Sequence, residues 1–73
     1  MKQLDVRPIL KNGGEPFDNI MSFVDQLTPG ESFELLATFR PDPLLQVLKG
    51  RGFSGEATEL GPNFWSVVFS PVS

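Results

Sequence analysis

The sequence predicts an α/β fold, a two-layer sandwich in which a mixed four-stranded sheet carries two helices on one face. Three observations predict it. Four segments alternate apolar and polar side chains, as half-buried strands do. Two segments repeat apolar residues every three or four positions, as amphipathic helices do. Turn-forming Gly, Pro and Asn residues separate the six segments, so the expected order is βαβαββ within a single domain over residues 1–73.

The chain is expected to begin with a strand and a loop. Apolar and polar residues alternate over residues 3–7, which predicts the strand. A loop is expected over residues 8–14, because Pro8 favours an extended residue before it and because Gly13 and Gly14 permit positive φ.

A helix and a second strand follow. Apolar residues at helical spacing predict the helix over residues 17–27, and Thr28-Pro29-Gly30 ends it. Residues 32–39 alternate again and predict the strand. The side chains that these two segments should turn toward the core are Phe17, Ile20, Met21, Val24, Leu27, Phe33, Leu35, Ala37 and Phe39.

A second helix and two strands complete the predicted fold. Asp42 is expected to cap the helix by accepting a hydrogen bond from a free backbone N–H. The helix should end at Gly50 or Gly52, since glycine suits a left-handed cap. The last two strands are expected over residues 53–60 and 64–70, joined by a tight turn.

The amino-acid composition argues against several classes of function. The 73 residues include no Cys, no His and no Tyr, so the commonest nucleophile, the commonest general base and the usual zinc and haem ligands are missing. We therefore expect no catalytic residue, no metal and no cofactor, and hence a protein that is not an enzyme. A net charge of −3 disfavours nucleic acid as a partner. No apolar run approaches the about 18 residues of a membrane span, so we expect no signal peptide, no membrane binding and a cytoplasmic location.

One face of the predicted sheet is left without helices. Its side chains are Asp5, Leu36, Thr38, Phe64, Ser66 and Val68. Because contiguous exposed apolar side chains mark interaction sites, Leu36, Phe64 and Val68 are candidates for docking a protein partner of unknown identity. A homodimer through this face is the simplest symmetric version. A register shift of one residue would exchange Phe64 with Trp65 and remove this surface.

A second candidate site lies where the first two strands run into helices. A small anion can bind at helix N-termini, and the residues that would hold it are Arg7, Lys11, Gly13, Gly14 and Arg40. Glu15 and Asp42 already occupy those helix starts and would repel an anion. Arg7 can instead pair with Asp5 or Asp42, because ion pairs also cluster without a ligand.

Residues 50–55 match the pattern Gly-x-Gly-x-x-Gly of dinucleotide-binding loops. Such loops join a strand to a helix, whereas this segment is expected to join a helix to a strand. Gly50 and Gly52 are therefore interpreted as helix caps.

Several short segments of the sequence resemble those of a known family. They are Leu4-Asp5-Val6-Arg7, Gly13-Gly14-Glu15-Pro16-Phe17 and Phe39-x-Pro41-x-Pro43-Leu44. In this order they resemble the TusA/SirA-like superfamily, and within it an uncharacterised branch, domain of unknown function 2249. Sulfur-carrier members of the superfamily begin their first helix with Cys-Pro-x-Pro, where the helix N-terminus lowers the cysteine pKa so that the thiol can hold a persulfide. Here the corresponding positions are residues 13–16, without a cysteine.

The resemblance implies the fold and a role beside sulfur or redox enzymes, without persulfide transfer by this chain. We therefore expect a non-catalytic protein-interaction module. The alternative is a small-anion or metabolite sensor that uses Arg7, Lys11 and Arg40. Mutation separates the two hypotheses: Arg7→Ala with Arg40→Ala removes an anion response, and Phe64→Ser removes docking.

Overall fold

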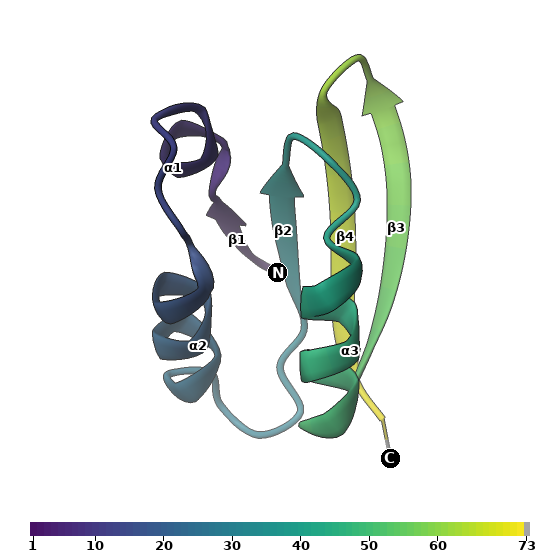
Figure 1. Cartoon of the computed structure of the whole chain (residues 1–73). Helices are drawn as coiled ribbons and strands as arrows, with labels where there is room; N and C mark the ends of the chain where they lie inside the picture. Colours follow the sequence, from purple (N-terminus) through teal and green to yellow (C-terminus); the bar gives the residue numbers. More distant parts are fainter. Residues whose placement is uncertain (73) are drawn as a thin grey trace.

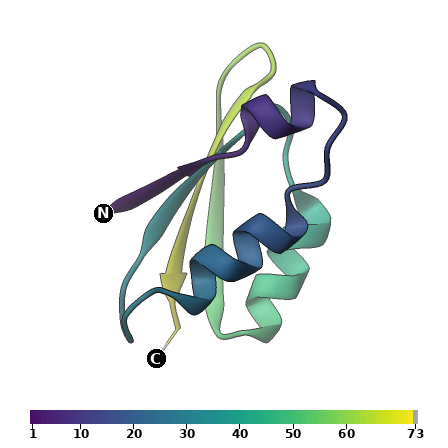
Figure 2. The ribbon, with the colours of Figure 1, turned by 90° about the vertical axis from the view of Figure 1, so that its left-hand side faces the viewer.

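The computed structural model describes residues 1–72 and confirms the predicted α/β fold. Its elements are β1 (Lys2–Asp5), α1 (Arg7–Lys11), α2 (Phe17–Asp25), β2 (Phe33–Ala37), α3 (Asp42–Gly50), β3 (Phe53–Gly61) and β4 (Phe64–Pro71) (Figure 1). Within residues 1–72 the strands form one mixed sheet in the order β1-β2-β4-β3, with β1 and β2 parallel and the other neighbours antiparallel. The helices lie together on one face of this sheet (Figure 2).

A short helix, α1, occupies part of the segment that was expected to be a loop. Pro8 lies in its first turn, where the missing N–H has no helical partner to lose. The carboxylate of Asp5 stabilises the start of the helix. It accepts one hydrogen bond from the backbone N–H of Arg7 at 3.0 Å and another from Nε of Arg7 at 2.9 Å. Leu10 packs against the core. These contacts outweigh the preference of a residue before proline for extended backbone, so the loop prediction was wrong here.

The start of α3 also differs from the prediction. Pro41 is the residue before the helix, and Asp42 is its first residue. The Asp42 carboxylate makes no capping hydrogen bond, because it pairs with the Arg40 Nε at 2.9 Å. Its charge still lies in the first turn, where the helix dipole favours an anion.

The pairing of β2 with β4 decides which side chains face the helices. Trp65 pairs with Ala37, which belongs to the core between sheet and helices. Because side chains alternate along a strand, Leu36, Phe64 and Val68 lie on the face without helices. The predicted faces are therefore confirmed, and the register shift of one residue does not occur.

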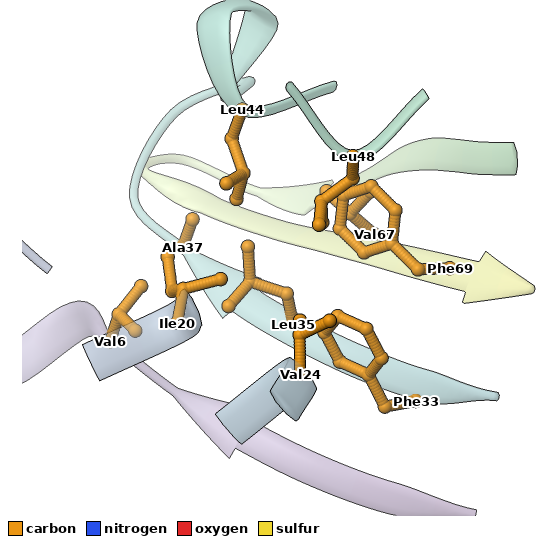
Figure 3. Packing of buried hydrophobic residues seen from close by; sticks show 10 residues of the cluster. All are labelled: Val6, Ile20, Val24, Phe33, Leu35, Ala37, Leu44, Leu48, Val67 and Phe69. Atoms are coloured by element: carbon orange, nitrogen blue, oxygen red, sulfur yellow. The ribbon is translucent and has the colours of Figure 1, made fainter. Parts of the chain in front are cut away.

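The core fills the space between the sheet and the helices. Its buried residues are Val6, Ile20, Val24, Phe33, Leu35, Ala37, Leu44, Leu48, Val67 and Phe69 (Figure 3). The fully buried ring of Phe33 stacks on Phe69 of β4, with 5.2 Å between their centroids. It also meets the edges of two more rings, Phe23 of α2 at 5.3 Å and Phe53 of β3 at 6.0 Å. One side chain of β2 thus contacts a helix and two strands.

Two residues that were expected in the core are instead half exposed. Phe17 has 42% of its surface exposed and Phe39 has 51%. Phe17 is the first residue of α2, and Phe39 follows the end of β2 at Ala37. Both lie at the end of an element, where neither helical periodicity nor strand alternation still determines the direction of a side chain.

Gly55 permits α3 to pack directly on the backbone of β3. A Cβ atom at this position would lie 2.7 Å from Cε1 of Phe69 and would overlap with the side chain of Leu45 on α3. The Gly50–Gly55 segment joins α3 to β3, as predicted, and Gly52 has a φ of +89° in the turn between them. The glycine at position 55 is therefore required by close packing.

We expect Gly55→Ala to lower the free energy of unfolding by about 1–3 kcal/mol, the usual cost of overpacking a core. Urea denaturation followed by circular dichroism measures this change. Gly50→Ala is the matched control, because a Cβ at Gly50 meets nothing within 4 Å and alanine is the better helix former. Equal stability of the Gly55→Ala variant and the wild type would contradict the packing argument.

Candidate functional site

The face of the sheet without helices carries a hydrogen-bonded carboxylate at its centre. Glu34 of β2 accepts a hydrogen bond from Ser66 Oγ at 2.5 Å and another from Gln3 Nε2 at 2.8 Å. These two hydrogen bonds hold the pKa of Glu34 below its ordinary value, and the bond from Ser66 has the larger effect. The three side chains join β4, β2 and β1. An ionised group therefore lies beside Val68, which pairs with Glu34 across the strands.

The three apolar residues considered for docking on this face are less exposed than expected. Leu36 lies on an inner strand and has only 8% of its surface exposed. Phe64 and Val68 are half-buried. The guanidinium of Arg7 covers the ring of Phe64, with 4.5 Å between Cζ and the ring centroid. The expectation that Leu36 is exposed was wrong.

Two of the three cations considered for anion binding are paired with carboxylates. Arg7 donates to Asp5 through Nε at 2.9 Å and through a terminal nitrogen at 2.8 Å. This pair lowers the pKa of Asp5, mainly through the hydrogen bond from the guanidinium, and raises the pKa of Arg7. Arg40 pairs with Asp42 at 2.9 Å. Both pairs reduce the positive charge that an anion would meet.

The five residues of the proposed anion site do not share one hollow. Arg40 lines an open hollow of about 670 Å³ along α3 and the start of β3, and none of the other four residues lines it. Lys11 is exposed at the end of α1. The backbone N–H groups of Gly13 and Gly14 donate to Leu10 O at 3.1 Å and to Ile9 O at 2.9 Å. These amides are therefore already bonded.

An apolar groove lies on the opposite side of the sheet, between α2 and α3. Its volume is about 150 Å³. Of the twelve described residues that line it, only Glu15 is charged. They come from the residue between β1 and α1, the three helices, β2 and the segments before α2 and α3. The groove thus gathers apolar side chains from both halves of the chain.

The width of the groove follows from the side chains around it. Ala37 at the end of β2 carries only a methyl group, and Leu44 of α3 points toward it, with Ile20 of α2 on the other side (Figure 3). The half-exposed rings of Phe17 and Phe39 lie at its rim. Three prolines, at positions 16, 41 and 43, also line it and restrict the backbone. The groove is therefore bounded by rigid segments.

The sequence patterns do not predict this groove, because Phe17 and Phe39 fit the patterns of core residues. A usable signal was present in their neighbours. Pro16 precedes Phe17 directly, and Pro41 follows Phe39 by two residues. An aromatic residue beside a proline at the end of an element is less constrained to face the core than one in the middle of it.

A family model described as "Uncharacterized conserved protein (DUF2249)" matches residues 3–71. The chain belongs to this family. The match covers both sides of the groove, and it confirms the resemblance to domain of unknown function 2249. Comparisons with curated proteins and with solved structures gave no match.

Within residues 1–72, no helix is both long enough and apolar enough to cross a membrane. In the same part of the chain, no three His, Cys, Asp or Glu side chains lie close enough together to hold a metal ion.

The hydrogen bonds to Glu34 predict an acid-dependent loss of stability. A carboxylate with a lowered pKa stabilises the fold above the ordinary pKa of glutamate, about 4.3, and this contribution is lost as the pH falls through the lower folded value. We expect Glu34→Gln to show a shallower fall of the melting temperature between pH 5 and pH 3 than the wild type, in a series of thermal scans.

Glu56→Gln is the control for that series, because it removes one charge from β3 without touching Gln3 or Ser66. Asp5 and Glu31, whose pKa values are also lowered, stay in all three proteins. If the acid slope of Glu34→Gln equals that of the wild type, the network does not contribute to stability.

Proposed function

We propose that this chain is a non-catalytic protein-interaction module that docks a partner protein in the apolar groove between α2 and α3. The observation that carries the proposal is the pair of half-exposed rings, Phe17 and Phe39, at the rim of a groove with a single charged residue. Covering apolar surface contributes about 25 cal/mol per Å². Aromatic side chains beside a pocket are also frequent hot spots of protein interfaces.

The groove supports docking better than the opposite face of the sheet does. On that face Leu36 is buried, Arg7 covers Phe64, and Glu34 is ionised. Three prolines at the borders of the groove restrict its backbone. Such preorganisation lowers the entropic cost of binding.

We further propose that the module is related to the TusA/SirA-like superfamily and acts as an accessory to sulfur or redox enzymes. The element order, which is βαβαββ apart from the short additional helix α1, and the sequence over residues 13–17 support the relationship. The positions that correspond to the carrier motif end at Pro16, which lines the groove. Without a cysteine, the chain itself would bind a partner and not carry sulfur.

The small-anion sensor remains the alternative, with Arg7, Lys11 and Arg40 as its residues. It has less support than docking, because Arg7 and Arg40 are paired with carboxylates and the amides of Gly13 and Gly14 are bonded within the chain.

Site-specific photo-crosslinking tests the docking function. A photoreactive phenylalanine analogue replaces Phe39 in one protein and Leu60 in another, and both are irradiated in cells that express the protein. Leu60 is the control, because it is 54% exposed but lies on β3 and does not line the groove. We expect a discrete adduct with one protein from position 39 alone.

The same experiment includes Phe17→Ser in the chain that carries the crosslinker at position 39. Loss of a hot-spot ring should lower the adduct yield at least about tenfold. Equal labelling from positions 39 and 60, or a yield that Phe17→Ser leaves unchanged, would show that the groove is not the docking site.

A further inference from the structure

We infer that the groove binds a peptide segment of the partner that presents one phenylalanine- or leucine-sized side chain close to a lysine or arginine. This inference rests on the proposed docking function and adds the chemistry of the partner. It follows from the size of the groove, from its place on the sheet and from the charges beside it.

The size of the groove admits one side chain. An apolar cavity of about 150 Å³ is large enough for a benzene ring, and the groove has about this volume. Its floor is β2, which already pairs with β1 and β4 on its two sides. A partner therefore cannot add a strand there, so it binds by inserting a side chain.

Two carboxylates lie beside this pocket. Glu15 lines the groove, and together with Phe17 and Asp18 it also lines a second hollow of about 240 Å³. The two hollows share Glu15 and Phe17 in their linings, so they are adjacent at these two residues. A side chain in the groove would thus have an acidic hollow directly next to it.

No ion pair compensates the charges of these two carboxylates within residues 1–72. Glu15 and Asp18 are exposed, and neither takes part in an ion pair there. By contrast, Asp42 at the start of α3 is paired with Arg40. The negative charge is therefore concentrated on the α2 side of the groove.

Charge complementarity favours a basic residue near the apolar side chain that the peptide inserts into the groove, which we call the anchor. A lysine or arginine two positions from the anchor can reach the acidic hollow, since residues two apart in an extended peptide are about 7 Å apart on the same side. An acidic residue at that position would be repelled by Glu15 and Asp18. The net charge of −3 acts in the same direction at longer range.

Selection from a random heptapeptide phage library tests this inference. The immobilised protein is the target, and Phe39→Ser is used for counter-selection, so that only peptides that need the groove are kept. We expect these peptides to combine one Phe, Leu, Ile or Met with a Lys or Arg two positions away.

One selected peptide is then titrated against charge variants by fluorescence anisotropy. The double variant Glu15→Gln with Asp18→Asn should bind it about fivefold more weakly at low salt, as expected for two exposed ion pairs. Glu56→Gln with Glu59→Gln changes the net charge equally on β3 and should bind within twofold of the wild type. The difference should shrink in 0.5 M NaCl, because salt screens exposed charges.

The outcomes separate this inference from the proposed function. Groove-dependent peptides with acidic neighbours, or without any charge preference, would overturn the inference and leave docking in the groove intact. If no selected peptide depends on Phe39, and a repeat with Phe17→Ser as the counter-target gives the same result, both are wrong. Melting temperatures within a few degrees of the wild type confirm that the variants are folded.

Discussion

The contact between Phe33 and the three rings around it holds the two layers of this small domain together. Phe33 is fully buried on an inner strand, and its partners come from α2, β3 and β4. Aromatic pairs of this kind contribute about 0.5–1.5 kcal/mol each beyond the area that they bury. At the other end of the same strand stands Ala37, whose methyl group leaves the groove open. The large side chain of Phe33 at one end of β2 thus fills the core, and the small side chain of Ala37 at the other end leaves space for the candidate binding site.

The two faces of the sheet differ in how far their apolar side chains are covered by neighbouring groups. On the face without helices, Arg7 covers Phe64 and the network around Glu34 crosses three strands. On the other face, Phe17 and Phe39 remain half exposed beside the groove. The candidate docking surface therefore lies on the helix side, although sequence patterns alone pointed to the opposite side.

Sequence patterns predicted the fold because strand alternation and helical periodicity repeat over enough residues to be recognised. The faces of β4 followed from alternation, which continues from Phe64 to the end of the strand. Helix α1 has five residues, too few for a periodic signal, and its start depends on the carboxylate of Asp5. The groove arises from the meeting of α2, β2 and α3, which no local pattern describes.

Gly55 connects the packing of α3 with the shape of the groove. Leu45 rests on Gly55, and its neighbour Leu44 forms one wall of the groove. A Cβ at position 55 would meet the end of the Leu45 side chain and the edge of the Phe69 ring, so these side chains or α3 itself would have to shift. A shift of α3 would move Leu44 as well, so the packing of α3 on the sheet and the shape of the groove are not independent of each other.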